Sequence, residues 1–194
     1  MSPVPCLLSP RIVMNAVFAL GNVLMGDDGV GPAVVRGFEA AYAVPTDVDI
    51  VDLGTPGLDL LPWLGDVDRV ILVDAVKSDR PPGTVLVYDK ADIMRHAPMP
   101  RIGPHDPGVK AALFALEFAG RAPREVVLVG VVPATTAIGL ELSPPVLAAV
   151  PAAIEQVAAA LRRFGVAIDK RTSREVSLSW PPIPAAVSSQ SGSG

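Results

Sequence analysis

Short runs of consecutive apolar residues, each bounded by polar residues or by glycine and proline, set the pattern of this chain. The predicted strands are residues 12–20, 48–53, 69–76, 84–88 and 125–133. Apart from 48–53, which contains Asp49 and Asp52, these runs are nearly continuous rather than alternating, which indicates strands that are buried on both faces, as in a mostly parallel sheet.

Apolar residues at helical spacing separate the strands. Val34, Phe38 and Tyr42 mark one face of a helix predicted over residues 32–42, with Pro32 in the first turn, where its missing N–H costs nothing. The other predicted helices are residues 58–64 (a short helix or turn), 109–119 and 144–164. Alternating strands and helices predict an α/β fold with helices on both faces of the sheet.

The length of 194 residues suits one domain with overhanging ends. We predict a compact domain over residues 12–168. Residues 1–11 form an N-terminal extension that we expect to be flexible, because prolines and serines dominate it without any period. Residues 169–194 form a C-terminal tail that we expect to be disordered, since it ends in a Ser/Gly-rich stretch.

Composition excludes several classes of protein. The net charge of −4 and the scattered Lys and Arg residues give no basic face for nucleic acid. No apolar stretch reaches the roughly 20 residues that a membrane helix needs. The single cysteine, Cys6, rules out an internal disulfide, and no secretory signal is evident. We therefore expect a cytoplasmic protein without a membrane or nucleic-acid partner.

In open parallel sheets, ligand sites lie beyond the carboxyl ends of the strands. The first strand leads into residues 21–31, a loop with four glycines and the adjacent acids Asp27 and Asp28. Both acids could simply cap the helix that follows, or they could belong to a site. A phosphate-binding loop is disfavoured, because G-x-G-x-x-G and a P-loop lysine are missing.

Two further candidates follow later strands. Asp74 comes after four apolar residues at the end of the third strand, where it could cap a turn or bind a ligand. His105 stands in a loop shaped by Gly and Pro on both sides, although a lone loop histidine is usually a surface residue. Together, two oxygen ligands and one nitrogen ligand would leave open positions on a metal, as in catalytic sites. A nucleophilic triad is poorly supported, and H-E-x-x-H is absent.

Motifs in a fixed order carry a family resemblance. They are G-N-V-L-M-G-D-D-G-V-G at 21–31, D-L-G-T-P-G at 52–57, V-D-A at 73–75 followed by P-G-T at 82–84, His105 in a short loop before a helix, and L-V-G-V-V-P at 128–133 followed by G-L and L-S at 139–143. On these motifs the chain resembles the maturation endopeptidases of [NiFe] hydrogenases over nearly all of residues 12–168.

The resemblance implies a three-layer α/β/α sandwich around a twisted, mostly parallel five-stranded sheet. It implies an endopeptidase that removes the C-terminal peptide of the hydrogenase large-subunit precursor after nickel insertion. The nickel would be carried by the substrate, with no permanent organic cofactor, and the protease would be a monomer. The family's metal-site and catalytic positions fall on Asp28, Asp74 and His105; some members have Glu in place of Asp28.

The sequence is also compatible with two other functions. The chain could be a non-cleaving protein that binds nickel or the large subunit, or a metal-dependent hydrolase of small substrates. Asp27 could act as a general base, although capping is its favoured role.

Overall fold

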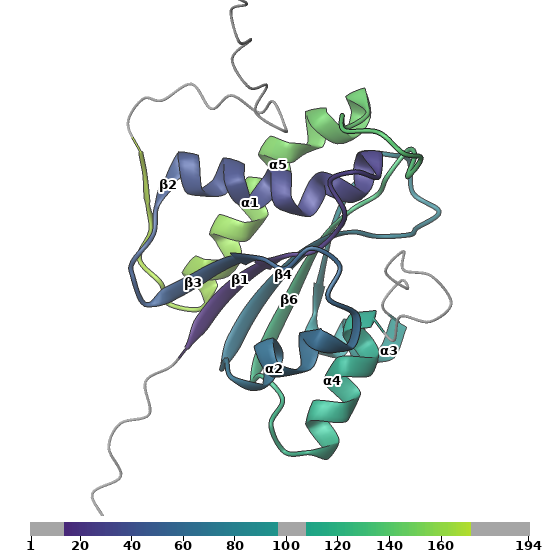
Figure 1. Cartoon of the computed structure of the whole chain (residues 1–194). Coiled ribbons are helices and arrows are strands. Elements are labelled where there is room, and N and C mark those ends of the chain that lie inside the picture. Colours follow the sequence, from purple (N-terminus) through teal and green to yellow (C-terminus); the bar gives the residue numbers. More distant parts are fainter. Residues whose placement is uncertain (1–13, 97–107, 172–194) are drawn as a thin grey trace, which may run out of the picture.

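A five-stranded sheet lies between two layers of helices (Figure 1). The structure, a computed structural model, describes residues 14–96 and 108–171. The sheet has the order β3-β1-β4-β6-β5, and every neighbouring pair is parallel except β5 with β6. Its strands are β1 (Asn15–Ala19), β3 (Val48–Asp52), β4 (Arg69–Ala75), β5 (Val85–Asp89) and β6 (Glu125–Val131). The expected three-layer α/β fold is confirmed.

Side chains of the central strands alternate between two apolar cores. In β4, Ile71 and Val73 face one core, whereas Val70 and Leu72 face the other, and all four are fully buried. This period of two explains why the strand is apolar throughout, since each face is covered. Fully burying one such side chain stabilises the fold by roughly 1.5–3 kcal/mol.

Each layer of helices covers one of these cores. The helices α1 (Val30–Ala41) and α5 (Pro144–Arg163) pack together on one face of the sheet. On the other face lie α2 (Leu60–Gly65), α3 (Lys90–His96) and α4 (Gly108–Phe118). Short 3-10 turns, η1 (Gly26–Gly29) and η2 (Gly57–Asp59), precede α1 and α2.

The longest helix, α5, is apolar because it belongs to the core. Its length and composition alone would allow it to cross a membrane, but half of its most apolar window is buried inside the fold. Val146, Val150, Ala153 and Val157 recur at helical spacing and are fully buried. Their burial against the sheet and α1 accounts for the composition of α5.

The ends of the predicted domain need one revision. Residues 169–171 were assigned to the C-terminal tail, but β7 (Asp169–Lys170) pairs antiparallel with β2 (Tyr42–Ala43). Arg171 then donates from its backbone N–H to the carbonyl of Ala41 at 2.8 Å. The folded unit therefore extends to residue 171. The N-terminal extension and the rest of the tail lie outside the described residues.

Candidate active site

Two of the three predicted site residues come to the same edge of the sheet. The strands β1 and β4 are parallel neighbours, with Ala19 opposite Val73, so the loop after β1 begins beside Asp74. The backbone N–H of Leu20 donates to the carbonyl of Val73 at 2.8 Å and continues the pairing past the strand. Asp74 itself is 3% exposed and lies opposite Gly130 of β6.

Glycines let the loop after β1 fold back onto the strand ends. A Cβ at Gly31 would lie 2.1 Å from the carbonyl oxygen of Leu20 and 2.6 Å from that of Val73. Gly21 has φ +121°, and a Cβ there would lie 1.9 Å from the carbonyl oxygen of Asp28. Only glycine permits these approaches, which place Asp28 and the start of α1 against the ends of β1 and β4.

The carboxylate of Asp28 is half-buried at this edge. Its Oδ2 accepts a hydrogen bond from the backbone N–H of Asn22 at 2.8 Å. The side-chain oxygen of Asn22 in turn accepts from the N–H of Leu24 at 2.9 Å, which shapes the turn. Asp28 also lies in the turn directly before α1, where the helix dipole favours a negative charge.

The neighbouring Asp27 acts neither as a helix cap nor as a general base. It is fully buried and accepts hydrogen bonds at 2.8, 3.0, 2.6 and 2.8 Å. The donors are the backbone N–H groups of Ala134, Thr135 and Ser143 and the hydroxyl of Ser143. These donors fill the acceptor positions of a carboxylate, which argues against a general base. Neither η1 nor α1 has a side-chain cap, so the expected capping role is wrong.

Asp27 instead fastens a second loop to the first. Backbone hydrogen bonds join the same two loops: the N–H of Gly26 donates to Gly139 at 2.8 Å, and the N–H of Gly139 donates to Leu24 at 3.0 Å. Residues 139–143 of this second loop (residues 134–143) belong to a family motif, but the sequence predicts no contact between the loop and Asp27. One available signal was Ser143 before Pro144, which is typical of a helix N-cap; its hydroxyl bonds Asp27 instead of capping α5.

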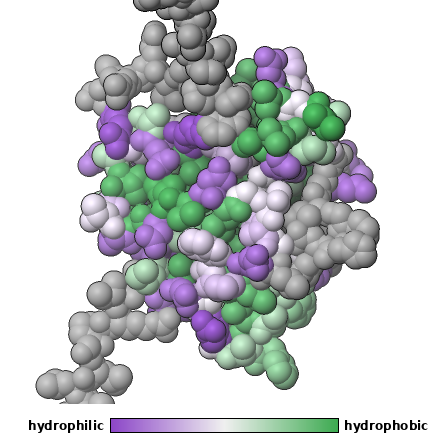
Figure 2. Space-filling view, in the orientation of Figure 1, coloured by the Kyte–Doolittle hydropathy of each residue, from purple (hydrophilic) through white to green (hydrophobic). Residues whose placement is uncertain are grey.

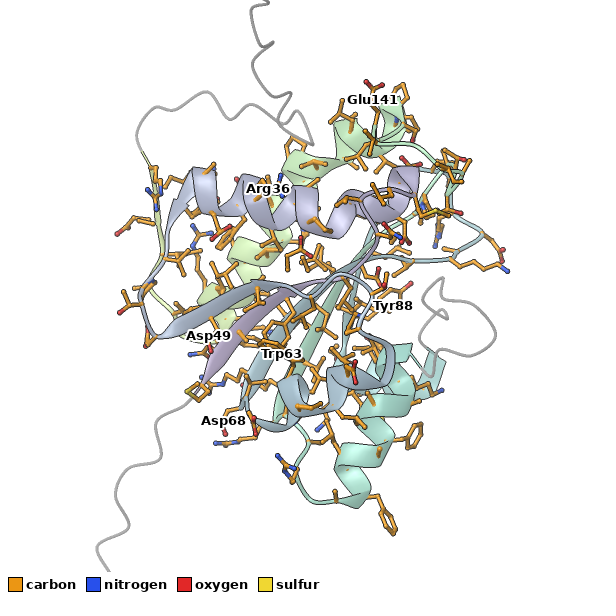
Figure 3. All side chains as sticks on the ribbon, viewed as in Figure 1. Arg36, Asp49, Trp63, Asp68, Tyr88 and Glu141 are labelled. Atoms are coloured by element: carbon orange, nitrogen blue, oxygen red, sulfur yellow. The ribbon has the colours of Figure 1, made fainter. Side chains whose placement is uncertain are left out.

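Three other aspartates, near the ends of β3 and β4, are not part of the candidate site. Asp52 ends β3 at the same edge, but it is exposed and accepts from the N–H of Gly54 at 3.0 Å. Its charge acts on Arg36 of α1: burial lowers the pKa of Arg36, while Asp52 and Glu39 raise it. Figure 3 labels Asp49 and Asp68, which lie near the amino ends of β3 and β4, away from Asp28.

His105 lies outside the described residues, so the predicted set of three ligands is represented here by Asp28 and Asp74. Among residues 14–96 and 108–171, no group of three His, Cys, Asp or Glu side chains is arranged to hold a metal. The carboxylates of Asp28 and Asp74 lie on adjacent segments of one edge, and carboxylate oxygen is a type of ligand that divalent cations accept. A third ligand from the segment before α4 would complete the predicted site.

The fold and these carboxylates define an α/β protein with a candidate site at the carboxyl ends of parallel strands. The sequence model described as hydrogenase maturation protease matches residues 32–160. The hydrogenase 2 maturation protease of Escherichia coli is 37% identical over 156 residues, which cover 77% of this chain and 92% of that protein. HupD of Rhizobium leguminosarum, a hydrogenase expression/formation protein, is 34% identical over 176 residues, covering 90% and 84%.

A solved structure of a hydrogenase maturation protease has the same fold as this chain. The hydrogenase maturating endopeptidase HybD from E. coli superimposes with a TM-score of 0.74 at 34% identity, covering 82% of this chain and 98% of that one. The chain belongs to the hydrogenase maturation protease family. It is therefore a hydrolase, an endopeptidase of hydrogenase maturation.

Proposed function

We propose that this protease removes the C-terminal peptide of a [NiFe] hydrogenase large-subunit precursor once nickel has been inserted. Membership of the maturation protease family supports the activity and the substrate class. The observation that supports the site assignment is the position of Asp28 and Asp74 at the same edge of the sheet, on the loop after β1 and at the end of β4. We further propose that the protease is a monomer and acts in the cytoplasm.

In this proposal the nickel belongs to the substrate. Asp28, Asp74 and His105 bind it as the precursor arrives and so hold the scissile peptide in register. A bound divalent ion can polarise a carbonyl or lower the pKa of a water molecule, and either effect would favour hydrolysis of the peptide. A precursor without nickel would lack this anchor, which makes cleavage depend on the metal content of the substrate.

The test is a cleavage assay with the nickel-loaded and the nickel-free precursor, read by mass spectrometry as loss of the C-terminal peptide. We expect cleavage of the loaded precursor alone. Asp28→Asn should lower this cleavage more than about 100-fold, because losing even an outer-shell partner of a metal ligand costs roughly 10–100-fold.

Asp52→Asn is the matched control, since it changes a carboxylate at the same edge that also accepts a backbone N–H. It should cleave at close to the wild-type rate. Equal rates for wild type and Asp28→Asn would remove Asp28 from the site. Cleavage of the nickel-free precursor would show that nickel does not control the reaction.

A further inference from the structure

Three large apolar side chains stand exposed on the two loops that Asp27 joins. Leu24 is 56% exposed, Ile138 is 89% exposed and Leu140 is 48% exposed. Single exposed apolar residues are ordinary, but a group of them beside a functional site marks a binding surface. One of the apolar areas in Figure 2 lies at the upper right, where Figure 1 places the start of α5 and the loop before it.

The two loops form one surface because they are bonded to each other. The N–H of Gly139, between Ile138 and Leu140, donates to the carbonyl of Leu24 at 3.0 Å. Met25 and Gly139 also form a parallel bridge. The three side chains thus extend from adjacent backbone segments, and we call them the apolar docking surface.

The apolar docking surface is held in a fixed position relative to Asp28. Asp27, the residue before Asp28, bonds Ala134 and Thr135 at one end of the second loop and Ser143 at the other. Asp27 is completely buried, so these hydrogen bonds are shielded from water. Hydrogen bonds in the protein interior are stronger than those at the surface. A ligand on this surface would therefore lie in a defined register with the site.

We propose that the apolar docking surface binds an apolar segment of the large-subunit precursor close to its scissile peptide. This inference rests on the proposed function. A protein substrate must approach the edge that carries Asp28 and Asp74, and Leu24 of this surface stands four residues before Asp28 on the loop at that edge. A second copy of the chain bound here would obstruct the same approach.

The size of the surface suits a transient substrate contact. Stable protein interfaces use roughly 20–30 residues on each side, and this group has three large apolar side chains. Binding energy taken from a part of the substrate that does not react can be used to position the part that does. The surface would thus add affinity and orientation to the contact that the metal supplies.

The test compares two double variants. Ile138→Ser with Leu140→Ser removes most of the surface, whereas Phe114→Ser with Phe118→Ser removes two exposed side chains of α4, 52% and 97% exposed. Figure 1 shows α4 on the far side of the sheet from α1 and α5, which makes the second pair a matched control. We expect the first variant to raise KM for the nickel-loaded precursor at least tenfold, with kcat within about twofold; tenfold corresponds to about 1.4 kcal/mol.

Direct binding separates this inference from the proposed function. Calorimetry with the nickel-free precursor should show at least tenfold weaker binding by the first variant than by wild type or control. An unchanged Kd and KM would overturn the docking surface even if cleavage occurs as proposed. If wild type binds but cleaves neither precursor, the proposed function fails while a weakened Kd still supports docking. Absence of any wild-type binding overturns the inference.

Discussion

The hydroxyl of Tyr42 donates a hydrogen bond to the carboxylate of Glu155, lying 3.0 and 2.9 Å from its two oxygens. Tyr42 directly follows α1 as the first residue of β2 and is fully buried, whereas Glu155 lies in α5. The Nζ of Lys170 in β7 is 2.7 Å from the same carboxylate. The carboxylate of Glu155 thus joins α5 to both strands of the small sheet, β2 and β7.

Tyr42→Phe should lower the free energy of unfolding by about 1 kcal/mol, the usual net contribution of one hydrogen bond. The ring and its stacking on Phe38, with centroids 5.2 Å apart, would remain. Urea unfolding measures the change. Tyr88→Phe on β5 is the control and should shift stability by less than about 0.5 kcal/mol. An equal loss of unfolding free energy in both variants would show that the hydrogen bond from Tyr42 to Glu155 does not stabilise the fold.

Stability should fall in acid partly because of Glu155. Its hydrogen bonds from Lys170 and then from Tyr42 lower its pKa below the ordinary value. A carboxyl whose pKa is lower in the folded state stabilises the fold above its unfolded pKa, and the contribution disappears as the pH drops through the folded value. Melting temperatures of wild type and Glu155→Gln should differ most near neutral pH and converge in acid. A difference that is constant with pH would contradict this account.

The same ion pair should weaken at high pH, because Glu155 raises the pKa of Lys170. A raised pKa stabilises the fold below the unfolded value for lysine, and this contribution is lost as the pH rises through the folded value. Lys170 is exposed, so added salt should screen the pair. Melting curves of wild type and Lys170→Met at neutral and strongly alkaline pH, in low and high salt, test both effects. The difference between the two proteins should shrink in alkali and in salt.

Gly31→Ala should destabilise the protein by about 3 kcal/mol and impair processing, because the added methyl group would collide with two backbone carbonyls. These carbonyls, of Leu20 and Val73, belong to the strand ends and cannot move without disturbing the sheet. Gly139→Ala is the control, since its Cβ would meet only the oxygen of Ala137 at 3.9 Å. Thermal unfolding should separate the two variants clearly, and similar melting temperatures would refute the steric argument.

Asp27→Asn should cost about 1–3 kcal/mol, because an amide group in either orientation would face at least one N–H with a donor instead of an acceptor. Ser143→Ala removes only the hydroxyl and should cost about 1 kcal/mol. Denaturant unfolding of the two variants checks this order. The order would be reversed if Asp27 contributed mainly through the hydroxyl of Ser143.

The three central strands could be predicted from the sequence because they are buried on both faces. The runs at 12–20, 69–76 and 125–133 contain β1, β4 and β6. The edge strands β3 and β5 are partly exposed; the run at 48–53 contains β3, and the run at 84–88 is displaced from β5 by one residue. Burial on both faces leaves an uninterrupted apolar signal that needs no knowledge of partners. The principal helices were predicted for a similar reason, since each has one apolar face.

Elements with weak apolar patterns were missed. The helix α3 has one fully buried side chain, Ile93, which gives no period. Its available signal was a reciprocal cap: the N–H of Asp92 donates to Asp89 at 2.7 Å, and the N–H of Asp89 donates to Asp92 at 3.4 Å. The two-residue pair of β2 and β7 depends on tertiary contacts and has no local signature.

The site was predicted in part for a physical reason. Parallel strands bring their carboxyl ends to one edge, so the acids at 27 and 28 could be grouped with Asp74 by position, and the family resemblance then selected Asp28. The role of Asp27 could not be deduced, since its partner Ser143 is 116 residues away and a single sequence does not reveal such a pair. His105 remains a prediction.

The hydrogen bonds of Asp27 also have a consequence for the order in which the protease becomes functional during synthesis. The loop with Asp27 and Asp28 leaves the ribosome early, but the donors that fix it follow 107 to 116 residues later. Contacts across such separations form late, because the intervening chain must first be made and brought together. A nascent chain that stops short of Ser143 would carry Asp28 and Asp74 without a fixed second loop. The protease should therefore acquire activity only after most of its own chain has been translated.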